Sequence, residues 1–175
     1  KKYLDINIFG FINIIDSTLK NKPEKYVYAS SSSVYGDLKI LPAKEFNKLQ
    51  PINVYAMTKK INETTAKFYS NYHNLNFVGL RYFTVYGEWG RPDMFLFKLY
   101  KAYFLKEIFF LNNLGEHKRD FTYIGDVVKF TKKIIFHKKK DKKNLIFNIC
   151  SNNPIKISKI IDYFKNNIGY VKIKK

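Results

Sequence analysis

Cysteine, arginine and long hydrophobic runs are scarce in this chain of 175 residues. A single cysteine, Cys150, cannot form a disulfide within the chain, which excludes a disulfide-stabilised secreted fold and predicts a reducing, cytoplasmic compartment. Charged residues interrupt every apolar run before it reaches the roughly 20 residues that a membrane-spanning helix needs. Residues 1–5 carry two lysines, but no secretory hydrophobic segment follows them. We therefore expect neither a membrane span nor a secretory signal.

The charge of the chain is strongly positive, with 32 lysines and arginines, 14 acidic residues and a formal net charge of +18. Such a surface attracts polyanions at long range and can bind nucleic acid non-specifically. Only three of these cations are arginines, the residue that sequence-specific readers of bases and phosphates favour. The lysine-rich run at residues 137–143 is most simply a solvated connection. No specific nucleic-acid partner is expected, and polyanion binding is kept as a minor alternative.

Apolar residues alternate between helical spacing and short runs rich in β-branched and aromatic residues. The spacing predicts helices at residues 4–19, 54–72, 94–104, 126–136 and 157–166, and strands at residues 26–29, 77–81, 108–111 and 145–150. Strands that alternate with helices are typical of a parallel sheet covered by helices. The predicted fold class is therefore α/β.

Tyr55 and Lys59 are the strongest candidates for catalysis. Their spacing of four places them on one face of the predicted helix at residues 54–72, one turn apart. A free tyrosine, with a pKa of about 10, is a poor base near neutral pH, but a neighbouring ammonium favours the ionised phenol. Such a pair can take a proton from a sugar hydroxyl while a hydride leaves the same carbon. Taken alone, the pattern is weak, and two residues that merely share a helix are the simpler interpretation.

Four consecutive serines, Ser30 to Ser33, strengthen the catalytic interpretation. They follow the predicted strand at residues 26–29, and parallel sheets bind their ligands where the strands end. Small hydroxyl groups at such a position can donate hydrogen bonds to a sugar and accept them. An ordinary serine-rich turn is the alternative, which the neighbouring strand and the Tyr-Lys helix make less favoured.

Five motifs in a fixed order resemble the extended short-chain dehydrogenase/reductases, the NAD-dependent epimerase/dehydratase family, and within it most closely the UDP-glucuronate 4-epimerases. They are Ala-Ser-Ser-Ser-Ser-Val-Tyr-Gly at residues 29–36, Tyr-Ala-Met-Thr-Lys-Lys at 55–60, Leu-Arg-Tyr-Phe-Thr-Val-Tyr-Gly at 80–87, Trp-Gly-Arg-Pro-Asp-Met at 89–94 and Lys-Arg-Asp-Phe-Thr-Tyr-Ile at 118–124. The resemblance covers the chain to about Cys150, and several motifs in register are far more specific than one. It implies a partial Rossmann-type parallel sheet with flanking helices, plus part of a smaller substrate-binding region.

The resemblance implies NAD as the cofactor and gives roles to individual residues. Tyr55 would be the catalytic base, Lys59 would tune it while binding the nicotinamide ribose, and Ser31 matches the family's catalytic serine or threonine. The residues expected to contact NAD are Asn7, Tyr55, Lys59, Tyr82 and Phe83. For the last two, packing in the core is the competing interpretation.

A UDP-sugar is the implied substrate, and five residues are expected to contact it: Ser32, Ser33, Thr84, Arg91 and Arg119. Arg91 would suit a carboxylate on the sugar, because its planar fork matches that group. Arg119 resembles the arginine that binds the diphosphate. A surface ion pair is the alternative for both arginines.

The serine run also favours one reaction among those of the family. Dehydratases of this family place an aspartate and a glutamate where Ser32 and Ser33 stand, and the related decarboxylases carry a glutamate in place of Ser33. Neither carboxylate is present. Their absence favours epimerisation through a 4-keto intermediate, and the resemblance implies that the reaction is the NAD-dependent 4-epimerisation of UDP-glucuronate to UDP-galacturonate. The alternatives are a UDP-glucose/galactose-type epimerase or another nucleotide-sugar-modifying relative and, outside the enzymes, an inactive remnant or a basic polyanion-binding protein.

The Gly-rich turn with which the family binds the pyrophosphate does not occur among the eight glycines. We therefore expect a fragment that lacks the N-terminal Gly-rich motif and the C-terminal end, binds NAD weakly or not at all on its own, and lacks turnover. Residues 1–88 are assigned to the C-terminal part of the dinucleotide-binding domain, and residues 89–175 to the substrate-binding region with returning strands and helices. Relatives pair as dimers through two helices, here residues 4–19 and 54–72, so a homodimer is expected for the intact protein.

Overall fold

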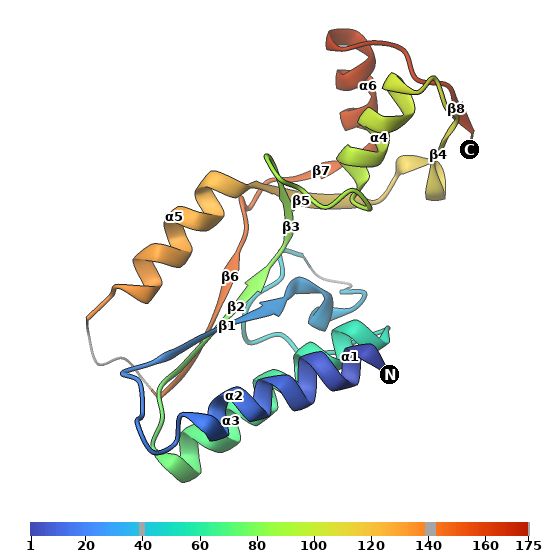
Figure 1. The fold of residues 1–175 in the computed structure, drawn as a ribbon. Coiled ribbons are helices and arrows are strands. Elements are labelled where there is room, and N and C mark those ends of the chain that lie inside the picture. Colours follow the sequence, from blue (N-terminus) through green and yellow to red (C-terminus); the bar gives the residue numbers. More distant parts are fainter. Residues whose placement is uncertain (39–40, 139–142, 175) are drawn as a thin grey trace. The chain divides into compact units, whose positions relative to one another are not determined.

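The structure is a computed structural model that describes residues 1–38, 41–138 and 143–174 (Figure 1). The chain divides into two units. The first comprises Lys1–Phe83 and Lys129–Ile149, and the second comprises Thr84–Val128 and Cys150–Lys175. The chain thus leaves the first unit once and returns to it, so each unit contains two separate segments of the sequence.

A three-stranded parallel sheet forms the centre of the first unit. Its strands are β1 (Tyr26–Ser31), β2 (Phe77–Tyr82) and β6 (Asn144–Ile149), in the order β1-β2-β6. The central strand β2 is buried without interruption from Phe77 to Leu80, which is typical of strands in parallel sheets. The predicted α/β fold with a parallel sheet is confirmed.

Two long helical segments pack on this sheet and run side by side (Figure 1). One consists of α1 (Lys2–Leu4), a π-helical segment (Asp5–Phe9) and α2 (Gly10–Ser17), and the other is α3 (Val54–His73). Helix α3 begins because the side chain of Asn53 accepts a hydrogen bond from the backbone N–H of Ala56 at 2.8 Å, and it ends at Asn74 in the left-handed conformation. The predicted helices at residues 4–19 and 54–72 are confirmed, whereas the periodicity does not predict the π-helical segment.

The core of the first unit lies between these helices and the sheet. Its buried members are Ile15, Tyr28, Ala66, Leu75 and Phe77. The rings of Tyr26 and Phe77 stack with their centroids 4.7 Å apart. Full burial of one such phenylalanine contributes about 2–3 kcal/mol to folding. This packing holds the helix that carries the candidate catalytic pair against the strand that carries the serines.

The second unit is built from shorter strands. β3 (Thr84–Tyr86), β5 (Lys118–Tyr123) and β7 (Pro154–Lys156) form one sheet, in which β5 pairs parallel with β3 and antiparallel with β7. β4 (Phe109–Phe110) and β8 (Ile173–Lys174) form a parallel pair. Helices α4 (Phe95–Phe104) and α6 (Ile157–Asn167) supply much of a core that includes Leu99, Ile157, Ile161 and Phe164.

Several strands of the second unit are not predicted by the sequence pattern, for reasons that their residues show. β5 begins with three charged residues in a row, and β7 begins with Pro154, both unfavourable in strands. The predicted strand at residues 108–111 is present as the shorter β4. The predicted parallel arrangement holds for β5 with β3 but not for β5 with β7, which pair antiparallel over three residues.

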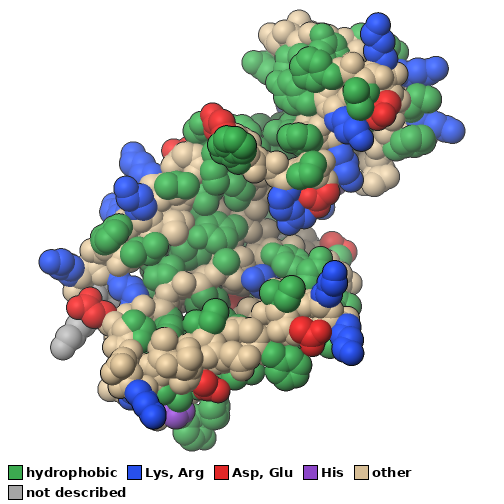
Figure 2. All heavy atoms as spheres, viewed as in Figure 1, with side chains coloured by type: hydrophobic (Ala, Val, Ile, Leu, Met, Phe, Trp, Pro, Cys, Tyr) green, Lys and Arg blue, Asp and Glu red, His purple; other side chains and the backbone are tan. Residues whose placement is uncertain are grey.

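Helix α5 (Ile124–Ile135) confirms the predicted helix at residues 126–136 and contains residues of both units. Within the lysine-rich run that follows it, residues 139–142 lie outside the described residues, so its role as a solvated connection stays a prediction. On the face shown in Figure 2, lysine and arginine side chains lie singly or in small groups among hydrophobic ones. None of the helices in the described part of the chain is long and apolar enough to cross a membrane.

Candidate functional site

The serine run lies where strand β1 ends. After Ser31 the chain enters a short 3-10 helix, Ser32–Tyr35, and the Ser31 hydroxyl accepts a hydrogen bond from the backbone N–H of Ser33 at 3.2 Å. Ser31 is buried, and Ser32 and Ser33 are half-buried. Because the Ser31 hydroxyl is the acceptor in this bond, it can still donate its own proton to a ligand.

Tyr55 and Lys59 lie one turn apart on α3, as their spacing predicts. The ammonium Nζ of Lys59 lies 5.9 Å from the centroid of the Tyr55 ring. The same ammonium donates a hydrogen bond at 2.9 Å to the backbone carbonyl of Ala29, the residue directly before the serine run. Burial lowers the pKa of Lys59 from its ordinary value. The lysine thus joins the helix that carries Tyr55 to the strand that carries the serines.

Asn7 reaches the same helix from the π-helical segment. Its side-chain amide Nδ2 donates a hydrogen bond at 3.0 Å to Oγ1 of Thr58, the residue directly before Lys59. The ring centroid of Tyr3 lies 5.8 Å from that of Tyr55. Segments of π-helix are frequent at functional sites. The structure therefore brings Asn7 to the first turns of α3, and its role toward a cofactor stays a prediction.

Tyr82 and Phe83 lie at the end of β2. Tyr82 is the register partner of Ser31 in the β1–β2 pair, and its hydroxyl lies 3.0 Å from the hydroxyl of Thr131. The ring centroid of Phe83 lies 6.5 Å from that of Tyr35. Both side chains are half-buried. They lie at the same end of the sheet as the serines, but each also has neighbours in the protein that account for its position.

In the second unit, Thr84 and Arg119 line one cavity of about 400 Å³. Lys98 of α4 and His117 also line it, together with Asp93 and several phenylalanine rings. No sequence motif singles out Lys98 or His117, because neither belongs to a spacing with chemical meaning. A cavity that combines cations with aromatic rings suits a ligand with phosphate groups and a flat base.

Arg91 forms an ion pair with Asp93 on the surface. Its Nε donates to one carboxylate oxygen of Asp93 at 2.9 Å, and its Nη2 donates to the other. This pair lowers the pKa of the Asp93 carboxyl, mainly through the hydrogen bonds that the guanidinium donates. It is the surface ion pair named above as the alternative for Arg91. Whether the guanidinium also binds a substrate carboxylate stays a prediction.

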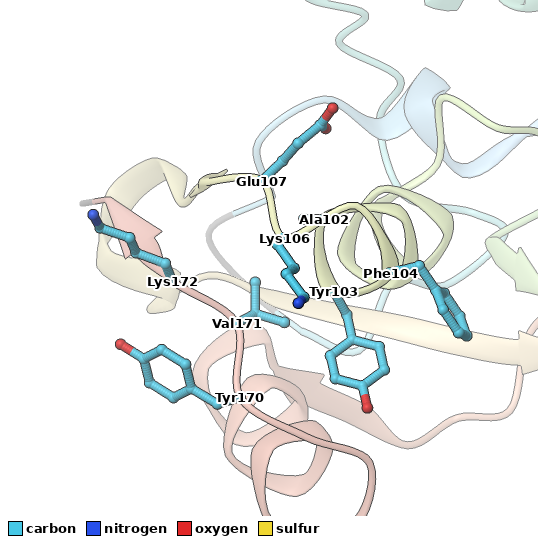
Figure 3. A pocket seen from close by; sticks show the side chains of 8 residues that line it. All are labelled: Ala102, Tyr103, Phe104, Lys106, Glu107, Tyr170, Val171 and Lys172. Carbon is cyan, nitrogen blue, oxygen red and sulfur yellow. The ribbon is translucent and has the colours of Figure 1, made fainter.

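A separate cavity of about 480 Å³ in the second unit contains none of the predicted site residues (Figure 3). It is lined by Ala102, Tyr103, Phe104, Lys106, Glu107, Tyr170, Val171 and Lys172. Lys106 extends toward Tyr103, whereas Glu107, Tyr170 and Lys172 point away from it. Because a ligand site needs polar groups that converge, this cavity is not a candidate.

A buried ion pair between Arg81 of β2 and Glu63 of α3 lies behind the serine turn. The motifs quoted above include Arg81 but give it no role, and they do not include Glu63. The signal in the sequence is that Arg81 interrupts an apolar strand, where a buried charge needs a partner, although no spacing identifies Glu63 as that partner.

The model of the NAD-dependent epimerase/dehydratase family matches residues 1–150, a stretch that contains every candidate residue from Asn7 to Arg119. This chain belongs to that family. The match confirms the family recognised from the motifs, and the Rossmann-type α/β fold is confirmed with it. The roles predicted for individual residues stay predictions.

Relatives of this epimerase/dehydratase chain include proteins that act on nucleotide sugars. It is 36% identical to Protein CapI of Staphylococcus aureus over 185 aligned residues, which cover 97% of this chain and 55% of CapI. It is 46% identical to UDP-glucuronate 4-epimerase 4 of Arabidopsis thaliana over 133 residues, which cover 73% of this chain and 30% of that enzyme.

One solved structure of a UDP-glucuronic acid 4-epimerase, from Bacillus cereus in complex with UDP-glucuronic acid and NAD, matches this chain with a TM-score of 0.90. The sequence identity is 29%, and the match covers 96% of this chain and 53% of that one. The chain thus spans about half the length, or less, of the relatives that it matches.

Proposed function

We propose that this chain carries the acid–base residues of an NAD-dependent nucleotide-sugar 4-epimerase that converts UDP-glucuronate to UDP-galacturonate. The placement of Lys59 carries the proposal: its ammonium lies 5.9 Å from the centroid of the Tyr55 ring and 2.9 Å from the carbonyl of Ala29, beside the serine turn. One side chain therefore links a base to a loop of hydroxyl groups. The family and the similarity to UDP-glucuronate 4-epimerases support the same activity.

In this proposal Tyr55 takes the proton of the 4-hydroxyl group of the sugar. The Lys59 ammonium stabilises the negative charge of the base, and the hydroxyls of Ser31 to Ser33 orient the reacting sugar. NAD, when bound, supplies an acceptor for the hydride of C4 and a donor for its return. Tyr55 gives the proton back when the 4-keto sugar is reduced on its other face, so the reaction leaves the base unchanged.

The donors near Tyr55 fit the nicotinamide ribose of NAD. An ammonium carries several N–H donors, and Lys59 uses one of them on Ala29, so that others can reach ribose hydroxyls. The phenol of Tyr55 and the amide of Asn7 add groups that can donate and accept. The 175-residue sequence contains no Gly-rich turn for a pyrophosphate, so these residues fit only the ribose part of the cofactor.

The cavity at Arg119 is proposed to hold the nucleotide part of the substrate. Arg119, Lys98 and His117 supply donors for a diphosphate, and the phenylalanine rings of the same cavity supply flat apolar surface for a base. Binding energy from this remote part of the substrate can then be used to orient the sugar. Thr84, which lines the same cavity, is proposed to contact the sugar.

A UDP-glucose/galactose-type epimerase is the second candidate, and the ion pair of Arg91 is the observation that favours it. The guanidinium fork that would bind a uronate carboxylate is engaged by Asp93. A neutral hexose needs no cation at that position. Comparison of the two sugars as substrates therefore decides between the candidates.

The assignment of residues 1–88 to the dinucleotide-binding part and of residues 89–175 to the substrate-binding region belongs to the same proposal. A homodimer is proposed with it. The helices expected at the dimer contact expose large hydrophobic side chains: Tyr3, Ile6, Phe9, Ile14, Met57, Phe68 and Tyr72. A second copy of the chain would bury such surface. Light scattering of the purified protein measures the mass directly, and a monomer at micromolar concentration would remove the dimer from the proposal.

Conversion of UDP-glucuronate in the presence of NAD, measured on the complete product of the gene, tests the proposed function. Tyr55→Phe should lower the rate by about 10³-fold, because it removes the base and keeps the ring. Tyr163→Phe is the control, since Tyr163 lies on α6 with 67% of its surface exposed and belongs to none of the proposed contacts, and it should leave the rate unchanged. Near-normal turnover by Tyr55→Phe would rule out the assigned role.

A further inference from the structure

The buried ion pair behind the serine turn joins three elements of the first unit. Arg81 of β2 donates two hydrogen bonds to the Glu63 carboxylate on α3, from Nε to Oε1 at 2.9 Å and from Nη2 to Oε2 at 2.7 Å. The Ser30 hydroxyl of β1 donates to the same Oε1 at 2.6 Å. The exposed fractions of Arg81, Glu63 and Ser30 are 3%, 8% and 2%, so water screens these charges little.

The remaining donor of Arg81, Nη1, reaches the serine turn. It donates to the phenol oxygen of Tyr35 at 2.8 Å and to the backbone carbonyl of Glu45 at 3.0 Å. Tyr35 donates its own proton to Oδ1 of Asn148 at 2.7 Å, and its ring centroid lies 4.7 Å from the guanidinium carbon. Burial raises the pKa of Tyr35, although its hydrogen bond with Arg81 acts in the opposite direction. The phenol is therefore a neutral donor at physiological pH.

Stability alone is a weak reason for such a pair. Removing two charges from water opposes folding, and apolar residues of similar size often stabilise a core as well or better. The pair can instead fix the positions of its neighbours, because a guanidinium holds its donors in a rigid planar fork and a lysine does not. The guanidinium of Arg81 forms hydrogen bonds to two segments at once: to α3 through Glu63 and to the serine turn through Tyr35.

These two segments carry the residues of the proposed chemistry. Glu63 follows Lys59 by one turn of α3 and Tyr55 by about two turns. Tyr35 ends the 3-10 turn that begins with Ser32. A shift of Arg81 would therefore move the candidate base and the candidate hydroxyl groups relative to each other.

We propose that Arg81 is a positioning residue, which sets the distance between Tyr55 and the turn Ser31–Ser33 through Glu63 and Tyr35. The inference rests on the function proposed above. In it, Arg81 acts on the reaction only through Tyr55 and the serines. Positioning of this kind has large effects, because a misplacement of about 1 Å can lower a rate by about 100-fold.

Tyr35→Phe is the most selective test, because it removes one hydroxyl and keeps the ring over the guanidinium. We expect kcat for UDP-glucuronate to fall about 10-fold, with KM and the thermal unfolding temperature little changed. Tyr69→Phe is the matched control: it removes a hydroxyl on α3 that donates to Asp16 at 2.5 Å, away from the serine turn, and kcat should not change. Equal kcat values for Tyr35→Phe and the control would overturn the inference.

A second variant separates positioning from a general loss of structure. Arg81→Lys keeps the charge and loses the fork, and we expect a fall in kcat of about 10-fold to 100-fold. Combined with Tyr55→Phe, neither Arg81→Lys nor Tyr35→Phe should lower the residual rate further, because a positioning residue has nothing left to position. A full additional loss in the Tyr55→Phe background would show an independent, merely structural effect.

Failure of the proposed function is recognised separately. If the complete product of the gene epimerises no UDP-sugar, the function is wrong, and amide hydrogen exchange then decides the inference by itself. Tyr35→Phe should speed exchange in peptides covering residues 31–36 and 54–60 together, whereas Tyr69→Phe should speed it in neither. Faster exchange in only one of the two peptides, or in neither, contradicts a coupling through Arg81.

Discussion

The two units hold their candidate residues in different ways. In the first unit, Ser31 is buried, Lys59 is half-buried, and both make hydrogen bonds to the backbone of the same strand-and-turn region. In the second, Arg91 and Arg119 are exposed, and one of them makes its ion pair with a neighbour two residues away. Lys59, proposed to assist the base, is thus held by a contact between residues 30 apart in the chain, whereas the two arginines proposed to bind substrate remain accessible.

The strands show the same contrast. The first unit has six-residue parallel strands that pair along their whole length, and the second has strands of two to six residues with mixed direction. A rigid sheet suits groups whose distance to a reacting atom must not change. If the two units differ in this way, substitutions at the candidate site of the first unit should slow the reaction, and those of the second should mainly weaken substrate binding.

Removal of the Lys59 ammonium should have the largest effect. Lys59→Met takes away both the charge beside Tyr55 and the hydrogen bond to Ala29, so we expect kcat/KM for UDP-glucuronate to fall by about 10³-fold. Lys60→Met, one residue further along α3, is the matched control and should retain activity. Steady-state assays of both variants make the measurement, and similar losses in the two would contradict a special role for Lys59.

The pH profile of the wild-type protein sharpens this prediction. Because burial lowers the pKa of Lys59, its ammonium is lost at a lower pH than that of an ordinary lysine, and activity should decline with it on the alkaline side. The Lys59→Arg variant stays positively charged at alkaline pH, so the decline of its activity should move to higher pH. An alkaline limb that stays in place in Lys59→Arg would show that another group sets it.

Core substitutions compare the stability of the units. Phe77→Ala in the first unit and Phe164→Ala in the second each remove a buried ring, and each should destabilise its own unit by about 3–5 kcal/mol. Hydrogen exchange should report the change in β1 and β2 for Phe77→Ala, and in α4 and α6 for Phe164→Ala. Equal changes in both regions for either variant would mean that the units unfold together.

Arg119→Met should weaken substrate binding more than chemistry. Charge-assisted hydrogen bonds contribute about 1.5–3 kcal/mol, so we expect KM for the UDP-sugar to rise about 10-fold to 100-fold, with a smaller change in kcat. Lys118→Met removes a neighbouring exposed cation and serves as the control. A lower kcat at unchanged KM would place Arg119 with the chemistry instead.

The smallest effect is expected for Arg91→Leu. A single exposed guanidinium contributes up to about 1 kcal/mol, so UDP-glucuronate should lose about 5-fold in kcat/KM while UDP-glucose is unaffected. Parallel assays of the two sugars measure the ratio. An unchanged ratio would favour the neutral hexose as the substrate.

Much of the first unit can be predicted from the sequence, because its elements are long and periodic. The spacing of Tyr55 and Lys59 gives their common face, and the serine run follows an evident strand. The contact between Lys59 and Ala29 cannot be predicted, because its acceptor is a backbone carbonyl, a group that every residue carries. The pairing of Arg81 with Glu63 depends on tertiary packing, which brings together residues 18 apart in the chain.

The second unit is less predictable for physical reasons. Strands of two or three residues carry too few side chains to establish a period, and β5 places Lys118, Arg119 and Asp120 at its start. Asp120 is nevertheless buried, because its carboxylate accepts hydrogen bonds from the backbone N–H groups of Ser151 and Asn153. Because these hydrogen bonds form only in the folded chain, the burial of Asp120 within a strand cannot be predicted from the sequence.

The π-helical segment Asp5–Phe9 changes the phase of the helix that contains it. The backbone N–H of Gly10 bonds the carbonyl of Asp5, so the helix takes one residue more than an α-helix would over that turn. Tyr3 and Phe11, eight positions apart, would diverge by about 80° in a regular helix, but with the extra residue they diverge by only about 20°. Tyr3, although 55% exposed, consequently lies against the ring of Tyr55, and Phe11 lies against that of Tyr28. A deletion of one codon within this segment would therefore leave a regular α-helix in which the two rings, then seven positions apart, still diverge by about 20°, so both contacts should survive the loss of the extra residue.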